Sequence, residues 1–373
     1  MSQQQRTQQL LGKVQSSLPI TLGEQARLAL LLAFPAIISQ LVTIVMEYMD
    51  TAMVGHLGAE ASASIGLVST TTWLMGGLCS SVAGGFAVLV AQSIGAGNRD
   101  RAKTILRKAI RFTLIVSSII GMIGVLIAPY LPQWLGGGED IKHDAYIYFL
   151  VFAASIPIWE INFLMASMLR STGNMIVPSV VNIVACLLDI VFNYIFIFVL
   201  DLGVLGAALG TLCYMPGYGI GDAATTLVGQ SIGAKRQDLQ RSFSYITLIL
   251  GVGFMTIMGI LMYVGIPYLM PLMTPDAAVQ ALTVECLRIE AFAEPMYAAS
   301  IVVYSIFVGA GDTKTPAMMN LGSMWIVRLP LAFLLAKTMG LKGVWIAMCI
   351  ELCFRGTIFL IRLNRKTRHD KHN

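Results

Sequence analysis

Long apolar segments separated by short polar connections dominate the chain. Each bilayer crossing needs roughly 20 apolar residues. Ten segments meet this length, near residues 28–52, 61–91, 109–132, 145–169, 177–200, 203–229, 243–270, 283–309, 317–337 and 340–361. Membrane strands need only about 10 residues, and open sheet edges are not tolerated in hydrocarbon. The pattern therefore predicts an all-α polytopic membrane protein.

Composition agrees with this fold class. The 373 residues are 56% hydrophobic and only 12% charged, whereas soluble domains carry about 25% charged residues. The cysteines all fall in predicted spans without a CxxC pair, so we expect packing roles and neither disulfides nor a metal cluster. These cysteines are Cys79, Cys186, Cys213, Cys286, Cys349 and Cys353.

Basic residues indicate the orientation of the chain. Most of the 25 Lys and Arg residues lie in the two tails and in the connections that follow even-numbered spans. Basic residues stay on the cytoplasmic side, so both termini are expected inside and the number of spans is even. Residues 1–26 form a polar N-tail that does not resemble a cleavable signal peptide. Because orientation explains the basic tail, no nucleic-acid partner is expected.

An internal repeat divides the chain. Leu89–Ala96 and Leu227–Ala234 are identical at seven of eight positions, at an offset of 138 residues. Over the following helices the same offset pairs Pro157 with Pro295, Gly173 with Gly311, Pro178 with Pro316 and Asn182 with Asn320. An even number of spans per copy makes the copies parallel, a pattern typical of secondary transporters.

The second copy is shorter than the first. Arg27 begins the first span 65 residues before Gln92, but the equivalent distance before Gln230 reaches residue 165, which already lies in the fourth span. The missing piece falls between about Thr211 and Met215. An even number of lost crossings preserves the topology. We therefore expect an N-terminal lobe of six helices at 27–211, a shortened C-terminal lobe at 212–363 and a basic tail at 364–373.

Ionisable residues inside membrane spans are costly and are candidates for function. Glu285 lies one turn from Arg288 and Glu351 lies one turn from Arg355, which predicts two local ion pairs. The full set is Glu47, Asp50, Glu160, Asp189, Asp222, Glu285, Glu290, Glu294 and Glu351.

Asp50 and Asp189 have no basic residue within a helical turn, and Asn193 follows Asp189 by one turn on the same face. Two carboxylates and an amide oxygen suit Na⁺, or a proton on a buried carboxyl. The alternative is a set of polar contacts that pack helices together.

The sequence contains no Walker A, GxSxG or HExxH motif and no paired His or Cys ligands. We therefore expect neither enzymatic activity nor a cofactor other than a coupling ion.

Several short motifs are spread across nearly the whole chain: Asp50–Gly55, Ala91–Asn98, Arg170–Asn174, Gly206–Thr211, Leu227–Ala234 and Gly309–Thr313. Together they resemble the MATE (multidrug and toxic compound extrusion) family of efflux transporters. The resemblance implies a two-lobe helical bundle with about ten helices instead of the family's twelve, in the bacterial inner membrane. It also implies export of organic, often cationic, compounds in exchange for H⁺ or Na⁺.

The family's sites map onto particular residues of this chain. The resemblance implies a coupling-ion site, for H⁺ or for Na⁺ as the metal, at Asp50, Asp189, Asn193 and Thr211, and a substrate cleft that includes Glu47, Glu294 and Tyr297. The family's usual order on the fifth helix is Asn then Asp, or Asn then Asn, whereas this chain has Asp then Asn, so the coupling ion stays open. Val308 replaces a usual Arg, and the seventh helix, which lines the cleft, is absent.

Two other functions remain open. A lipid-linked flippase of the same superfamily would need a basic cavity for a pyrophosphate head group, whereas the charges within the spans here are mostly acidic. A transporter remnant would insert without transporting, because its cleft is incomplete. Either way, we expect a monomer whose partners are small molecules and the lipid bilayer.

Overall fold

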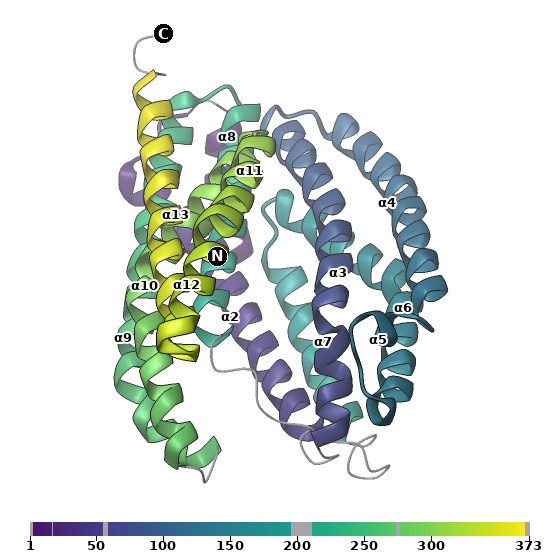
Figure 1. The fold of residues 1–373 in the computed structure, drawn as a ribbon. Coiled ribbons are helices and arrows are strands. Elements are labelled where there is room, and N and C mark those ends of the chain that lie inside the picture. Colours follow the sequence, from purple (N-terminus) through teal and green to yellow (C-terminus); the bar gives the residue numbers. More distant parts are fainter. Residues whose placement is uncertain (1–2, 17, 55–58, 195–210, 274–276, 370–373) are drawn as a thin grey trace. The chain divides into compact units, whose positions relative to one another are not determined.

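A computed structural model describes residues 3–16, 18–54, 59–194, 211–273 and 277–369, and all secondary-structure elements in these ranges are helices (Figure 1). They are α1 (Gln3–Gln15), α2 (Leu22–Val54), α3 (Ala59–Gly95), α4 (Arg99–Ile127), α5 (Leu131–Trp134), α6 (Glu139–Ser171), α7 (Ile176–Tyr194), α8 (Thr211–Gly233), α9 (Gln237–Met273), α10 (Ala277–Gly309), α11 (Lys314–Gly322), the π-helix η3 (Ser323–Arg328), α12 (Leu329–Met339) and α13 (Leu341–His369).

The helices account for the ten predicted spans. Eight are long and apolar enough to cross a membrane when the run from α11 to α12 counts as one. The others are α7, with 19 residues, and α8, with 23. The start of the predicted sixth span lies in 195–210, outside the described residues. The junction at Thr211–Met215 falls inside α8, which is helical without interruption.

The chain forms two compact units. Unit 2 is Val42–Ala208, and unit 1 is Met1–Leu41 together with Leu209–Asn373. In unit 2, α6 packs against α3 and α4. Its core includes Val68, Met75 and Cys79 from α3 and Phe149 and Ile156 from α6. In unit 1, α8, α9 and α10 pack together, and α13 packs on α10.

The backbone repeats at the turns that follow matching helices. Gly97 and Lys235, 138 residues apart, both adopt a left-handed conformation with φ of 73° and 57°. Gly173 and Gly311, at the same offset, share a φ of 84°. Each of these four amides donates a hydrogen bond to the carbonyl three residues earlier. The duplication seen in the sequence is therefore present in the conformation of the chain.

Close packing of helices also repeats. A Cβ added to Gly121 on α4 would lie 2.8 Å from the carbonyl oxygen of Ala153 on α6. A Cβ on Gly259 of α9 would lie 3.0 Å from the carbonyl oxygen of Ala291 on α10. Both pairs are related by the 138-residue offset. Small residues allow membrane helices to approach closely, and here they fix the same helix pair in both units.

The polar N-tail contains a helix. One face of α1 is buried, and its residues recur at the spacing of an amphipathic helix: Thr7, Leu10, Leu11 and Val14. α1 contacts α8 within unit 1. The Arg236 guanidinium donates to the carbonyl oxygen of Leu18 at 2.6 Å, and Lys13 pairs with Glu24 at 2.5 Å. These contacts fasten the segment before α2 to unit 1.

We predict opposite effects for alanine substitutions at glycines that differ in packing. Gly121→Ala and Gly259→Ala should each destabilise the protein by about 1 kcal/mol or more, because the helices must separate. Gly253→Ala on α9 should stabilise it slightly, since no atom lies within 4 Å of the added carbon and alanine favours helix. Thermal unfolding can be followed with a thiol-reactive dye, because the thiols of Cys79 and Cys286 are free and buried. Equal shifts at all three glycines would contradict the packing described here.

Candidate functional site

The proposed ion ligands lie on three helices. Asp50 is near the end of α2, Asp189 and Asn193 are near the end of α7, and Thr211 is the first residue of α8. All four side chains fall outside the described residues, so the ligand set stays a prediction.

A described polar contact joins α2 to α7 close to these positions. The Asn182 amide donates to the Thr43 hydroxyl at 2.8 Å. The sulfur of Cys186 lies 3.7 Å from the Asn182 nitrogen and 3.8 Å from the Thr43 oxygen. All three residues belong to unit 2, and Thr43 and Cys186 are far apart in sequence. The contact therefore fixes how these two helices align along their length.

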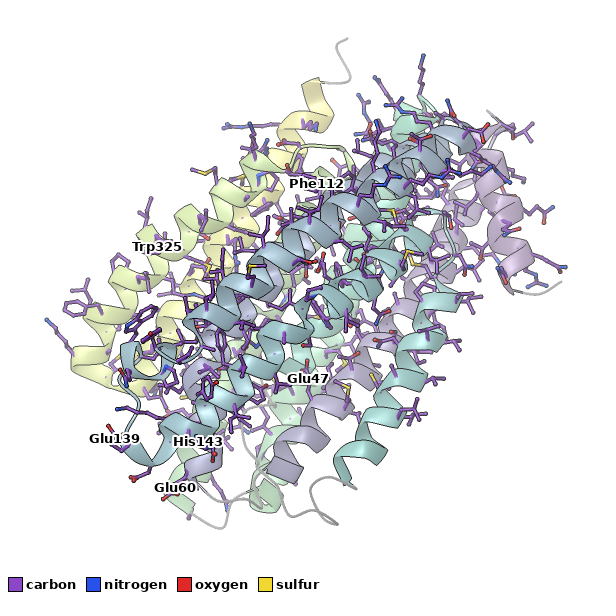
Figure 2. The ribbon with its side chains drawn as sticks, turned by 90° about the vertical axis from the view of Figure 1, so that its right-hand side faces the viewer. Glu47, Glu60, Phe112, Glu139, His143 and Trp325 are labelled. Carbon is purple, nitrogen blue, oxygen red and sulfur yellow. The ribbon has the colours of Figure 1, made fainter. Side chains whose placement is uncertain are left out.

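Glu47 follows Thr43 by one turn of α2 and is partly buried. Figure 2 shows Glu60, Glu139 and His143 near one end of unit 2, well away from Phe112 in the middle of α4. The opposite end of α3 leads into the basic start of α4, with Arg99, Arg101, Lys103, Arg107, Lys108 and Arg111. Unit 2 thus has one acidic end and one basic end.

Unit 1 buries two carboxyl groups one turn apart on α10. Glu294 is 1% exposed and Glu290 is 7% exposed. Among the described residues, neither oxygen of Glu294 has a hydrogen-bond partner, and the buried Oε2 of Glu290 has none either. Burying an unpaired carboxylate is costly, so this pair suits a proton or a bound cation. Tyr297, which is also a predicted cleft residue, follows Glu294 by three residues on the same helix.

A third buried carboxyl of unit 1 is fully paired. Glu351 on α13 is 0% exposed. It accepts hydrogen bonds from the Ser323 hydroxyl at 2.7 Å and from the Arg328 guanidinium at 2.7 and 3.1 Å. Arg355 lies 3.2 Å from its other oxygen and stacks over the Tyr297 ring at 5.3 Å. The predicted Glu351–Arg355 pair is confirmed.

The π-helix explains what the spacing along α13 could not reveal. Ser323 and Arg328 are the first and last residues of η3. A π-helix bonds residues five apart, which brings both side chains onto the side that meets Glu351. No pattern in the sequence signals this irregular turn, although Arg328 inside an apolar span was itself a sign of a buried acidic partner.

The other predicted ion pair is wrong. Glu285 pairs with Lys342, 57 residues away, rather than with Arg288. Arg288 instead stacks over the Tyr263 ring at 4.8 Å and reaches the Tyr263 carbonyl. Glu285 and Arg288 therefore each contact a residue on another helix and do not pair with each other.

In unit 2, Glu160 on α6 is 0% exposed, and neither carboxyl oxygen has a partner among the described residues. Its surroundings include the core residues of α3 and α6. No group of three potential metal ligands occurs in the described part of the chain. A cation bound there would therefore be held by a single buried carboxyl or by the Glu290–Glu294 pair.

The sequence profile of the MatE family matches residues 35–195 and 201–334. The chain belongs to the MatE family. It is 22% identical to a probable multidrug resistance protein NorM of Thermotoga maritima, over 88% of this chain and 90% of the relative. It is also 26% identical to an FAD transporter of Shewanella oneidensis, over 50% of this chain and 42% of the relative.

Solved MATE structures share the fold. The crystal structure of a mutant MATE transporter VcmN from Vibrio cholerae superposes with a TM-score of 0.84, at 17% identity, over 93% of this chain and 98% of that one. Membership places the chain among multidrug and toxin efflux transporters, and the relatives named here are transporters rather than enzymes. The alignment with the Thermotoga relative is 421 positions long but contains only 88% of the 373 residues of this chain. Many positions of that relative therefore have no equivalent residue in this MATE protein.

We predict that the Glu351 cluster stabilises unit 1 as a set. Arg328→Met should destabilise the protein by about 3 kcal/mol, because it leaves a buried charge only partly compensated. Arg328→Met combined with Glu351→Leu should recover part of that loss. Lys342→Met, which breaks an exposed pair, should cost less than about 1 kcal/mol. Thermal unfolding in detergent measures all three, and a double variant worse than Arg328→Met alone would contradict the prediction.

Proposed function

We propose that this MATE protein is a secondary antiporter that exports organic, often cationic, compounds in exchange for H⁺ or Na⁺. The observation that carries the proposal is the Asn182–Thr43 hydrogen bond. Successive membrane helices alternate in direction, so α2 and α7, with three spans between them, run the same way. Asp50 and Asp189 each follow the bonded pair by seven residues, or two helical turns. This equal spacing supports a placement of the two carboxylates at the same depth in the membrane, with Asn193 one helical turn further along α7.

The buried groups of unit 1 support an organic cation as the substrate. Glu290 and Glu294 supply unpaired acidic groups, while Arg328 and Arg355 are both engaged by Glu351. Acidic and aromatic side chains such as Glu294 and Tyr297 attract cationic ligands. The charges around these buried carboxyls argue against the lipid-linked flippase, which would require free basic groups for a pyrophosphate within its cavity.

We place the protein in the bacterial inner membrane with both termini in the cytoplasm. The basic end of unit 2, at the start of α4, and the basic tail of α13 support this orientation. The division into lobes at 27–211 and 212–363 remains part of the proposal. A monomer is sufficient, since each proposed site is built from one chain.

The remnant hypothesis is the second candidate, and the shortened second copy favours it. Thr211, a proposed ion ligand, begins α8 at the junction itself. If the shortened chain inserts and folds but does not transport, this hypothesis replaces the antiporter.

We predict that Asp50→Asn abolishes ethidium efflux from cells that lack their own pumps, because the variant loses the exchangeable charge. Glu60→Gln, an exposed acid at the start of α3, is the matched control and should export like the unchanged protein. Efflux that survives in Asp50→Asn would refute the coupling role. Absence of efflux from all three, with normal amounts of folded protein in the membrane, would establish the remnant.

The coupling ion can be separated in proteoliposomes by imposing a pH gradient or a Na⁺ gradient alone. We expect one gradient, and not the other, to drive uptake of a fluorescent organic cation, and we expect Asp189→Asn to lose that response. Transport of equal rate without either gradient would contradict antiport.

A further inference from the structure

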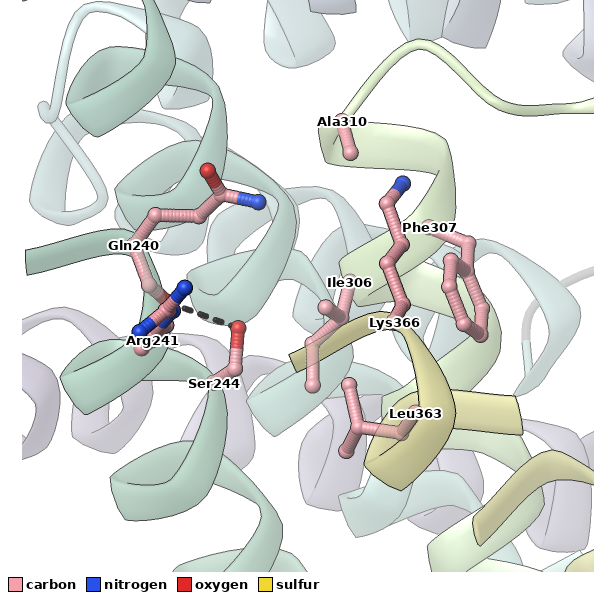
Figure 3. Close-up of a pocket in the computed structure, with 8 residues that line it drawn as sticks. All are labelled: Gln240, Arg241, Ser244, Ile306, Phe307, Ala310, Leu363 and Lys366. Atoms are coloured by element: carbon pink, nitrogen blue, oxygen red, sulfur yellow. Dashed lines mark hydrogen bonds between the residues drawn. The ribbon is translucent and has the colours of Figure 1, made fainter. Parts of the chain in front are cut away.

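A pocket opens in unit 1 where α9 begins and where α10 and α13 end. Figure 3 shows Arg241 and Lys366 on opposite sides of it. The remaining lining is partly polar and partly apolar, from Gln240, Ser244, Ile306, Phe307, Ala310 and Leu363. The pocket therefore has two cationic side chains on its walls and several apolar side chains in the rest of its lining.

Two other basic residues at this end of unit 1 have acidic partners. Arg236 pairs with Asp238 at 2.8 Å. Arg362, one turn before Lys366, pairs with Asp312 at 2.5 Å. Their charges are compensated within the protein and leave little attraction for an external anion.

Arg241 and Lys366 differ from these neighbours. Among the described residues, no carboxylate lies within ion-pairing distance of either. The Nε atom of Arg241 is buried and has no hydrogen-bond acceptor in the same part of the chain. The ammonium of Lys366 lies 5.2 Å from the ring centre of Phe307. Two positively charged side chains without a carboxylate partner on the walls of one pocket attract an anion.

The surface beside the pocket indicates what that anion is attached to. Arg241, Tyr245 and Ile249 follow one another at intervals of four residues on α9 and so share one face. Tyr245 and Ile249 are exposed large hydrophobic side chains, and α9 is long and apolar enough to span a membrane. The face that leads away from Arg241 therefore suits an acyl chain.

We infer that this pocket and the surface at its mouth bind the phosphate head group of an anionic phospholipid. The pocket itself has a volume of about 10 Å³, enough for one water molecule, so the phosphodiester lies at its mouth, between Arg241 and Lys366. The Gln240 side chain supplies a further polar contact, and one acyl chain runs along Tyr245 and Ile249. Basic pockets between membrane helices on the cytoplasmic side select such head groups. A zwitterionic lipid binds less well, because its ammonium group is repelled by the same two cations. The site is separate from the proposed transport chemistry and does not depend on it.

Native mass spectrometry of the purified full chain, titrated with phosphatidylglycerol, tests the inference. Arg241→Gln combined with Lys366→Gln should weaken binding about thirtyfold, since each cation near an anionic lipid contributes about one decade or slightly less. The matched control is Lys314→Gln combined with Arg365→Gln. It removes two exposed charges of unit 1 that do not line the pocket and should bind like the unchanged protein.

A charge-preserving variant guards against misfolding: Arg241→Lys combined with Lys366→Arg should retain binding within about threefold. Undiminished binding in the Gln double variant, or equal loss in the control, would overturn the inference, because the attraction would then be diffuse. Binding of phosphatidylethanolamine as tight as that of phosphatidylglycerol would also overturn it. Displacement of the lipid by millimolar glycerol phosphate or inorganic phosphate would assign the pocket to a free anion instead.

Discussion

A polar group that enters hydrocarbon must find its partner within the protein, because lipid supplies none. This constraint determines both the fold and the placement of charge in this chain. Helices satisfy their own backbone groups, and the described turns after α3, α6, α8 and α10 are short and hydrogen-bonded. The side chains show the same rule. The buried Glu351 accepts hydrogen bonds from Ser323 and Arg328 and forms an ion pair with Arg355, and the amide of Asn182 donates to a hydroxyl on another helix.

The exceptions are informative for the same reason. Glu160 and Glu294 are as buried as Glu351 but lack hydrogen-bond partners among the described residues. A neutral, protonated carboxyl tolerates this environment far better than a charged one. The contrast separates carboxyls that hold helices together from carboxyls that are available to a proton or to a cationic ligand. In unit 1 the two kinds lie on neighbouring helices, α13 and α10, which pack against each other.

The sequence alone was sufficient for the helical class, eight of the ten spans and the duplication, because these depend on apolar length and on residue identity at one constant offset. The turn geometry at Gly97 and Lys235 and the glycine contacts at Gly121 and Gly259 then followed the same offset. Local spacing also gave the Glu351–Arg355 pair, since both residues are on one helix.

Contacts between helices could not be obtained in this way. Arg328 reaches Glu351 through an irregular π-helical turn, and Lys342 meets Glu285 across two helices. Both depend on the rotation and height of packed helices, which a single sequence does not encode in any local pattern. The helix in the N-tail could have been predicted from the sequence, because the spacing of Thr7, Leu10 and Val14 is that of an amphipathic face. The polar composition of this segment hides that spacing.

One of the two places where the chain passes between the compact units lies within a helix. The boundary at Leu41 and Val42 falls inside α2, which runs from Leu22 to Val54. A helix of this length is a stiff rod about 50 Å long, clamped to unit 1 at its start by the contacts of α1 and bonded to α7 of unit 2 near its end. Pro35 lies a few residues before the boundary and lacks the N–H that would close the helical ladder there. Mechanically, α2 is a beam with one weakened section, and bending or torsion along this helix concentrates at that section.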